Sequence, residues 1–121
     1  MADKIANEHS IAKYTSVIKD EDDVAIAAAS LTTLTLTLYN SDDGAIINSR
    51  SVEDVLNANN VVVDSSGVLT WTMQPADNAI TGTGEFETHV ALFEYTWSAG
   101  AKRGSHEVTL IVQDITKIVA V

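Results

Sequence analysis

The chain has 121 residues, of which 45% are apolar and 20% charged, a composition that fits one globular domain and excludes disorder throughout. It contains no cysteine, which excludes a disulfide framework and any thiolate metal site. Seventeen acids against seven bases give a net charge of −10, which opposes binding to nucleic acid or to an anionic membrane. No run is long and apolar enough for a membrane span or a signal peptide, so we expect a protein made and kept in a bacterial cytoplasm.

Residues 1–30 differ from the rest and form a predicted N-terminal arm, in which Lys13–Ile18 could supply a first strand. They hold no Trp, Phe or Gly. The acidic run 20–23 predicts a solvated loop. A calcium site is the alternative because hard cations need several oxygen ligands, but the run lacks the spaced Asp-x-Asp-x-Asp-Gly pattern.

A half-buried strand is predicted over Leu31–Tyr39. Its apolar and polar side chains alternate with a period of two, with Leu34, Leu36 and Leu38 on one face and Thr33, Thr35 and Thr37 on the other. A turn over 40–44 ends it, and a short strand returns over 45–47. Next comes a serine followed by two acids, at Ser51, Glu53 and Asp54. A serine cap with acids in the first turn predicts a short helix over about 51–57.

A hairpin is predicted next, with strands at Val61–Val63 and Val68–Met73 joined by the turn residues 64–67. Alternation with threonines places Trp71 in the core. The only proline, Pro75, ends the second strand because proline cannot donate to a sheet ladder.

The longest predicted strand, Phe86–Trp97, changes phase along its length. Its apolar residues occupy even positions at first and odd positions later, so we expect a β-bulge near Leu92–Phe93. Strict alternation opposite Phe86 would point Glu85 and Glu87 outward, as solvated surface. A turn over 100–104 leads to a final strand over 106–112.

These elements predict an all-β fold, an immunoglobulin-like or jelly-roll β-sandwich over residues 31–121. One short helix and extended N- and C-terminal segments would complete it. The apolar segment 115–121 ends the chain.

No catalytic motif is present in the sequence, so we expect a protein that is not an enzyme and uses no cofactor, catalytic residue or metal. The closest match to a zinc-protease motif, at His106-Glu107, lacks the second histidine. His89 and His106 lie on neighbouring predicted strands, which leaves a two-histidine metal site as an alternative to ordinary strand histidines.

Three features predict contacts with a partner. Lys102 and Arg103 lie in a projecting turn of a very acidic chain, where they could bind a carboxylate-bearing surface. Trp97 lies beside that turn, and an exposed ring there would allow the alternative function of a carbohydrate-binding module. The apolar end of the chain suggests a segment held by a neighbouring subunit, through Ile115, Ile118, Val119 and Val121.

Two thirds of the chain resembles small tailed-phage virion proteins with an immunoglobulin-like fold. The resemblance lies in a Leu-rich strand ending at an Asp-Gly turn (residues 36–44), a Ser-Gly-Val hairpin followed by Pro-Ala-Asp (66–77) and a long aromatic strand (87–95). It implies a virion structural protein that assembles with capsid or other virion subunits and forms a homo-oligomer or symmetric assembly. Of the roles known for such proteins, we expect capsid decoration or cement, with a neck, tail-completion or baseplate adaptor as the alternative.

Overall fold

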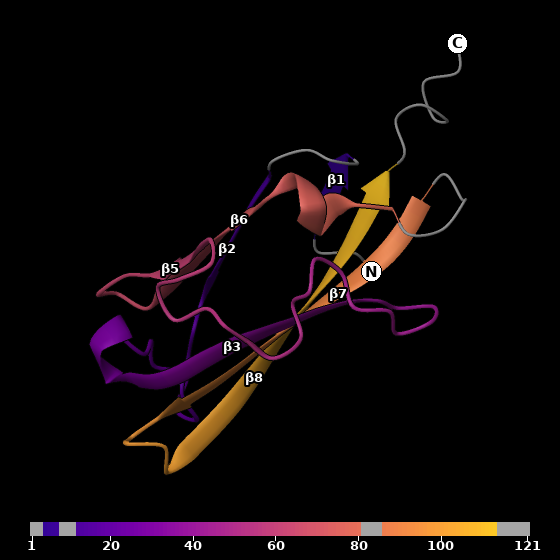
Figure 1. Cartoon of the computed structure of the whole chain (residues 1–121). Helices are drawn as coiled ribbons and strands as arrows, with labels where there is room; N and C mark the ends of the chain where they lie inside the picture. Colours follow the sequence, from indigo (N-terminus) through magenta and orange to yellow (C-terminus); the bar gives the residue numbers. More distant parts are fainter. Residues whose placement is uncertain (1–3, 8–11, 81–85, 114–121) are drawn as a thin grey trace.

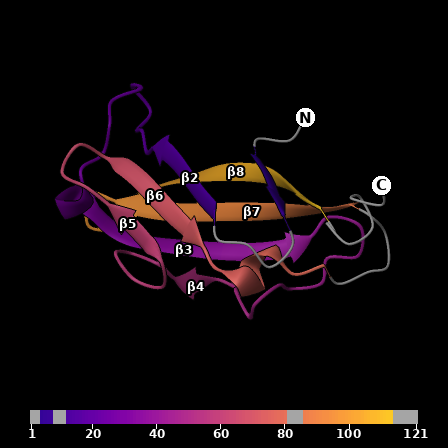
Figure 2. The ribbon, with the colours of Figure 1, turned by 90° about the horizontal axis from the view of Figure 1, so that it is seen from above.

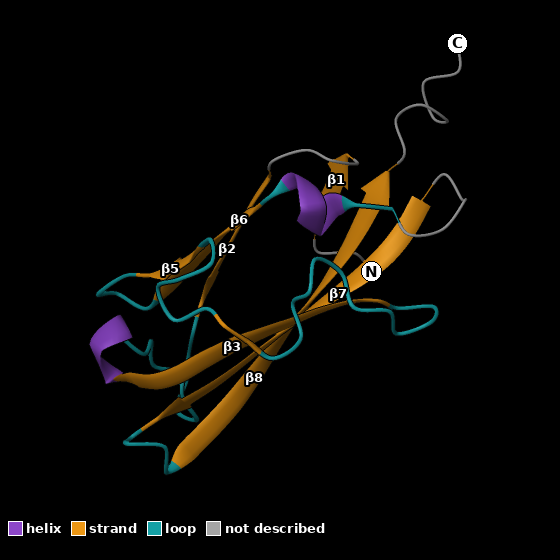
Figure 3. Cartoon of the chain, viewed as in Figure 1, coloured by secondary structure: helices purple, strands orange, loops and turns teal. Residues whose placement is uncertain are grey.

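The chain folds as two β-sheets packed face to face, in a computed structural model that describes residues 4–7, 12–80 and 86–113 (Figures 1 and 3). The larger sheet has the strand order β1-β8-β7-β3-β4 and the smaller one β2-β6-β5. The strands are β1 (Lys4–Asn7), β2 (Ala12–Val17), β3 (Leu31–Asn40), β4 (Glu53–Asp54), β5 (Val61–Val63), β6 (Val68–Met73), β7 (Phe86–Trp97) and β8 (Lys102–Gln113). Two short 3₁₀ helices, η1 (Ala28–Ser30) and η2 (Pro75–Asn78), join them. Within the described ranges, no helix is long and apolar enough to cross a membrane.

The strand order decides between the two predicted architectures. If the eight strands are read as A, B, C, C′, D, E, F and G, one sheet holds C′-C-F-G and the other holds B-E-D, which is the immunoglobulin-like arrangement. The first strand, β1, does not pair with β2 but joins the edge of the larger sheet, parallel to β8. The predicted all-β sandwich is therefore confirmed, and its strand order matches the immunoglobulin-like arrangement rather than a jelly roll.

The core follows from the alternation seen in the sequence. Leu34, Leu36 and Leu38 of β3 are fully buried, and the predicted core residue Trp71 is also fully buried. The Trp71 ring meets Phe93 of β7 edge to face, with centroids 5.7 Å apart. Burying such apolar area stabilises the fold by about 25 cal/mol per Å².

Contacts between the sheets show which strands face one another. The Trp71–Phe93 contact sets β6 over β7. The Tyr14 hydroxyl lies 2.6 Å from His106 Nε2 and the two rings stack, which sets β2 over the first half of β8 (Figure 2). β1 pairs only with the far end of β8, at Leu110–Gln113.

The predicted helix over 51–57 is wrong. Residues 53–54 instead form β4, an edge strand paired with Thr35 and Leu36 of β3. Val52 and Asn57 have φ of 50° and 51°, in the left-handed region that no α-helix contains. A helix this short gains few hydrogen bonds, whereas this loop buries Val55 completely.

The predicted bulge near Leu92–Phe93 is also wrong. β7 pairs with β8 without a break from Phe86 to Trp97, and its pairing with β3 is regular through Leu92 and Phe93. All the inward positions are odd: Glu87, His89, Ala91, Phe93 and Tyr95. Glu87 is therefore buried and not solvated, while Phe86 is 54% exposed. The apparent change of phase arose because polar residues fill the inward positions at one end of β7.

Candidate interaction surface

The outer face of the larger sheet has a polar half and an apolar half. Even-numbered residues of β7 point to this face, next to odd-numbered residues of β3 and β8. The polar half lies near the β7–β8 turn and comprises Thr33, Thr35, Glu94, Thr96 and Arg103. The apolar half lies toward the other end. It contains Tyr39, Phe86, Leu92, Ile111 and the buried Val90, interspersed with Thr37, Thr88, Thr109 and Gln113.

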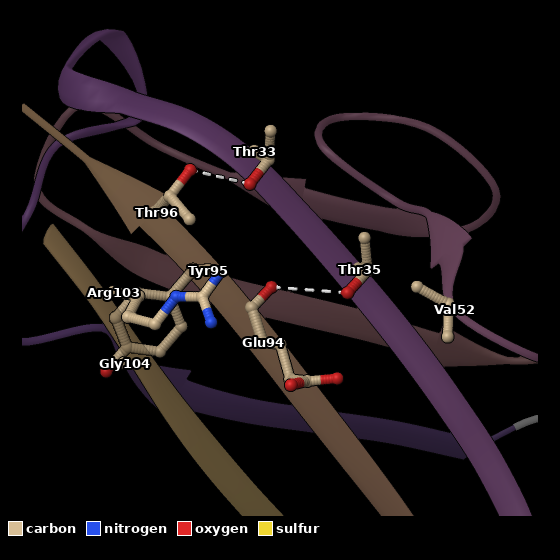
Figure 4. A pocket seen from close by; sticks show the side chains of 8 residues that line it. All are labelled: Thr33, Thr35, Val52, Glu94, Tyr95, Thr96, Arg103 and Gly104. Atoms are coloured by element: carbon tan, nitrogen blue, oxygen red, sulfur yellow. Dashed lines mark hydrogen bonds between the residues drawn. The ribbon is translucent and has the colours of Figure 1, made fainter. Parts of the chain in front are cut away.

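The polar half contains a hollow of about 240 Å³ (Figure 4). Its lining residues are Thr33, Thr35, Val52, Glu94, Tyr95, Thr96, Arg103 and Gly104. The hydroxyls of Thr33 and Thr96 are bonded across the strands at 2.6 Å. A side chain at Gly104 would clash with the Tyr95 ring, because a Cβ there would lie 2.9 Å from it.

Two neighbouring bases at the start of β8 have different surroundings. Lys102 Nζ donates to Glu21 Oε2 at 2.7 Å, a hydrogen bond that raises the pKa of Lys102 and lowers the pKa of Glu21. The Arg103 guanidinium, in contrast, makes no hydrogen bond or ion pair with any described residue. Of these two bases, Arg103 is the one without a side-chain partner among the described residues.

The acidic run 20–23 forms a turn in which the carboxylates of Asp20 and Glu21 accept hydrogen bonds from within the chain. The Asp20 carboxylate accepts the backbone N–H groups of Asp22 and Val24 at 2.9 and 3.0 Å. Asp20, Glu21 and Asp22 bring carboxylate oxygens within 4.8 Å of one another, but Glu21 is bonded to Lys102. The turn is therefore held by hydrogen bonds within itself and by one hydrogen bond to the start of β8.

Trp97 is half-buried and packs against the core. Its ring lies 5.6 Å from that of Tyr95, tilted by 31°. The Tyr95 hydroxyl donates to the Lys19 carbonyl at 3.2 Å, and burial raises the pKa of Tyr95. A carbohydrate-binding module stacks sugars on exposed aromatic faces. Tyr95 and Trp97 instead pack against each other and against the core.

The structure separates the two histidines of the alternative metal site. His89 is opposite Leu110, while His106 is opposite Phe93, four residues farther along the paired strands. His89 is fully buried and its Nε2 lies 2.6 Å from Glu87 Oε1. His106 is bonded to Tyr14 in the other sheet.

A buried ionic cluster around Arg50 escaped the sequence-based reasoning. Arg50 and Asp77 have side chains 3% and 0% exposed, and they are joined through Nε at 2.5 Å and Nη2 at 3.0 Å. Arg50 Nη1 also donates to Glu53 at 2.6 Å. Burial opposes the charge of Arg50, but the hydrogen bond and charge of Asp77, with those of Glu53, outweigh it and raise the pKa of Arg50.

The cluster joins the 48–60 loop to η2. Asp77 accepts two further bonds, from the Asn48 side chain and the Gln74 backbone, both at 2.8 Å. Arg50 Nη1 and Nη2 reach the Asn59 carbonyl and the Asn60 side chain at 3.1 Å. The one signal in the sequence was a lone arginine among asparagines, and it does not reveal a partner 27 residues away.

The predicted contacts Ile115, Ile118, Val119 and Val121 lie outside the described residues. Comparison of the chain with models of protein families, with curated proteins and with solved structures finds no match.

Proposed function

We propose that this chain is a non-enzymatic structural protein of a phage virion, a capsid decoration or cement protein that binds neighbouring subunits stoichiometrically. The resemblance of residues 36–44 and 61–97 to small virion proteins supplies the class. A neck, tail-completion or baseplate adaptor is the alternative within that class.

The observation that carries the proposal is the outer face of the larger sheet. It offers Arg103, which has no partner among the described residues, in a shallow hollow beside an apolar half in which Phe86 is 54% exposed. Arginine and aromatic residues are enriched at the centres of protein interfaces. A carboxylate of the partner in the hollow would pair with Arg103 bidentately.

Rigidity suits this role. The Arg50–Asp77 cluster holds the loop that carries Val52 at the rim of the hollow. A surface that is already ordered loses little conformational entropy on binding, which favours affinity. The apolar segment 115–121 would add a second contact, and repetition over a symmetric shell would multiply weak contacts by avidity.

The test is co-sedimentation with purified expanded capsids of the phage that encodes the chain. Arg103→Glu is expected to weaken binding by about tenfold, because it reverses the charge at a central interface position. Lys19→Glu is the matched control, since it makes the same charge change on a residue that does not line the hollow. Deletion of 115–121 is expected to weaken binding too, with the fold intact by circular dichroism. Equal binding of the wild type and Arg103→Glu would reject this surface, and absence of the wild type from virions would reject the function.

A further inference from the structure

Among the described residues, the smaller sheet ends in a strand, β2, whose outer edge has no pairing partner. Immediately after β2, Ile18 donates to the Gly67 carbonyl at 3.0 Å, next to the Val17–Val68 pair. Bonded residues alternate in an antiparallel ladder, so Tyr14 and Ser16 also point their backbone groups toward β6. Lys13, Thr15 and Val17 therefore point theirs away from the sheet, and no described residue bonds to them.

The opposite edge of the same sheet is closed. Asp64 and Thr72 take part in the β5–β6 ladder, which leaves the N–H groups of Val61 and Val63 pointing outward. Val61 donates to the Ala58 carbonyl at 3.1 Å, and Val63 donates to the Asn57 side chain at 2.7 Å. The preceding turn thus covers β5, whereas nothing comparable among the described residues covers β2.

The immunoglobulin-like topology explains why β2 is uncovered. In the constant-type arrangement, strand A pairs with strand B at this edge. Here the strand in the A position is β1, which has joined β8 in the other sheet. The place beside β2 is therefore vacant in one copy of the described chain.

We infer that this place is filled by β2 of a second copy, paired antiparallel about a twofold axis at Thr15. This register pairs all three outward-facing residues, Lys13 with Val17 of the second copy, Thr15 with Thr15 and Val17 with Lys13. Each such pair exchanges two backbone hydrogen bonds. The two small sheets become one continuous sheet, through an isologous interface of the kind most homodimers use.

The pairing is compatible with the side chains and the charge. Lys13 and Val17 are solvent-exposed, on the outer face of the sheet, and this register sets no like charges opposite each other. The acidic run that follows β2 falls at opposite ends of the interface in the two copies. The net charge of −10 on each copy still repels at long range, so the dimer is expected to tighten as salt is added.

The experiment is sedimentation velocity of the full-length chain over a concentration series. The wild type is expected to shift from 12.9 kDa toward twice that mass as concentration rises. Val17→Lys sets lysines opposite each other in two symmetry-related pairs and is expected to weaken the dimer by about tenfold. Val17→Glu, facing Lys13, is expected to strengthen it.

A charge swap separates pairing from a general charge effect. Lys13→Glu combined with Val17→Lys restores opposite charges across the axis and should restore the dimer that Val17→Lys loses. All these substitutions lie on the exposed face of β2, and circular dichroism checks that each variant is folded. A monomer at every concentration, or a dimer indifferent to residue 17, would overturn the inference. Neither result bears on capsid binding, which is measured separately, so this inference and the proposed function can fail independently.

Discussion

Two ion pairs of this chain connect segments far apart in the sequence and differ mainly in burial. Arg50 and Asp77 are 3% and 0% exposed, whereas Lys102 and Glu21 are 48% and 52% exposed. In the buried pair every lost bond leaves a polar group without water, while in the exposed pair water replaces the partner. The comparison indicates that the first pair holds the loops in place and that the second contributes little to stability.

Removing one partner of the buried pair should have the largest effect. Asp77→Ala is expected to lower the free energy of unfolding by about 3–5 kcal/mol, because it leaves the Arg50 charge buried and uncompensated. Urea denaturation measures the change. Arg50→Met together with Asp77→Leu is the control, and it should cost less than Asp77→Ala alone because no charge stays buried. A double variant as unstable as the single one would show that packing, not charge, decides the effect.

The Glu87–His89 bond tests an intermediate case, since it is buried but joins neighbouring positions of one strand. Glu87→Leu is expected to cost about 1–3 kcal/mol, the penalty for a buried polar group that loses its partner. Glu87→Gln, which can still bond to the imidazole, should cost less, as measured by thermal unfolding. Equal effects of the two substitutions would mean that the bond to His89 contributes nothing.

Breaking the exposed pair should have the smallest effect. Lys102→Met is expected to leave the urea midpoint unchanged within error, because exposed pairs contribute little and are screened. The pKa of Glu21 is lowered from 4.5, so its small contribution is present above that pH and is lost as the pH falls through the folded value. The pKa of Lys102 is raised from 10.5, so its contribution is lost as the pH rises through the folded value. Unfolding curves of wild type and variant should therefore coincide at neutral pH, and a clear gap there would contradict the comparison.

The parts of the fold that were predictable are those in which burial and sequence period agree. In β3, leucines and threonines alternate, and the leucines fill the core as expected. In β7 the same reasoning failed because Glu87 and His89 are buried and hydrogen-bonded to each other, while Phe86 is exposed. The prediction of a helix over 51–57 failed because the conformation of this loop depends on the contact of Arg50 with Asp77, which no local sequence pattern contains.

The candidate surface was predictable only in part. Arg103 was singled out by its charge on an acidic chain, and the structure sets it in the hollow. The bond that occupies Lys102 was not foreseeable, because its partner Glu21 is brought near by the fold. The threonines of the hollow appeared only as the polar face of a strand, since strand pairing decides which of them meet.

The parallel pairing of β1 with β8 has a consequence for biosynthesis. The first of the described strands bonds to the last of them, from Lys4 opposite Leu110 to Asn7 opposite Gln113. During translation at roughly 5–20 residues per second, the emerging N-terminal strand waits on the order of ten seconds for its partner. The smaller sheet can form earlier, since β2, β5 and β6 lie within the first two thirds of the chain. The pairing of β1 with β8 is thus a late step of folding, and contacts so distant in sequence make that step slow.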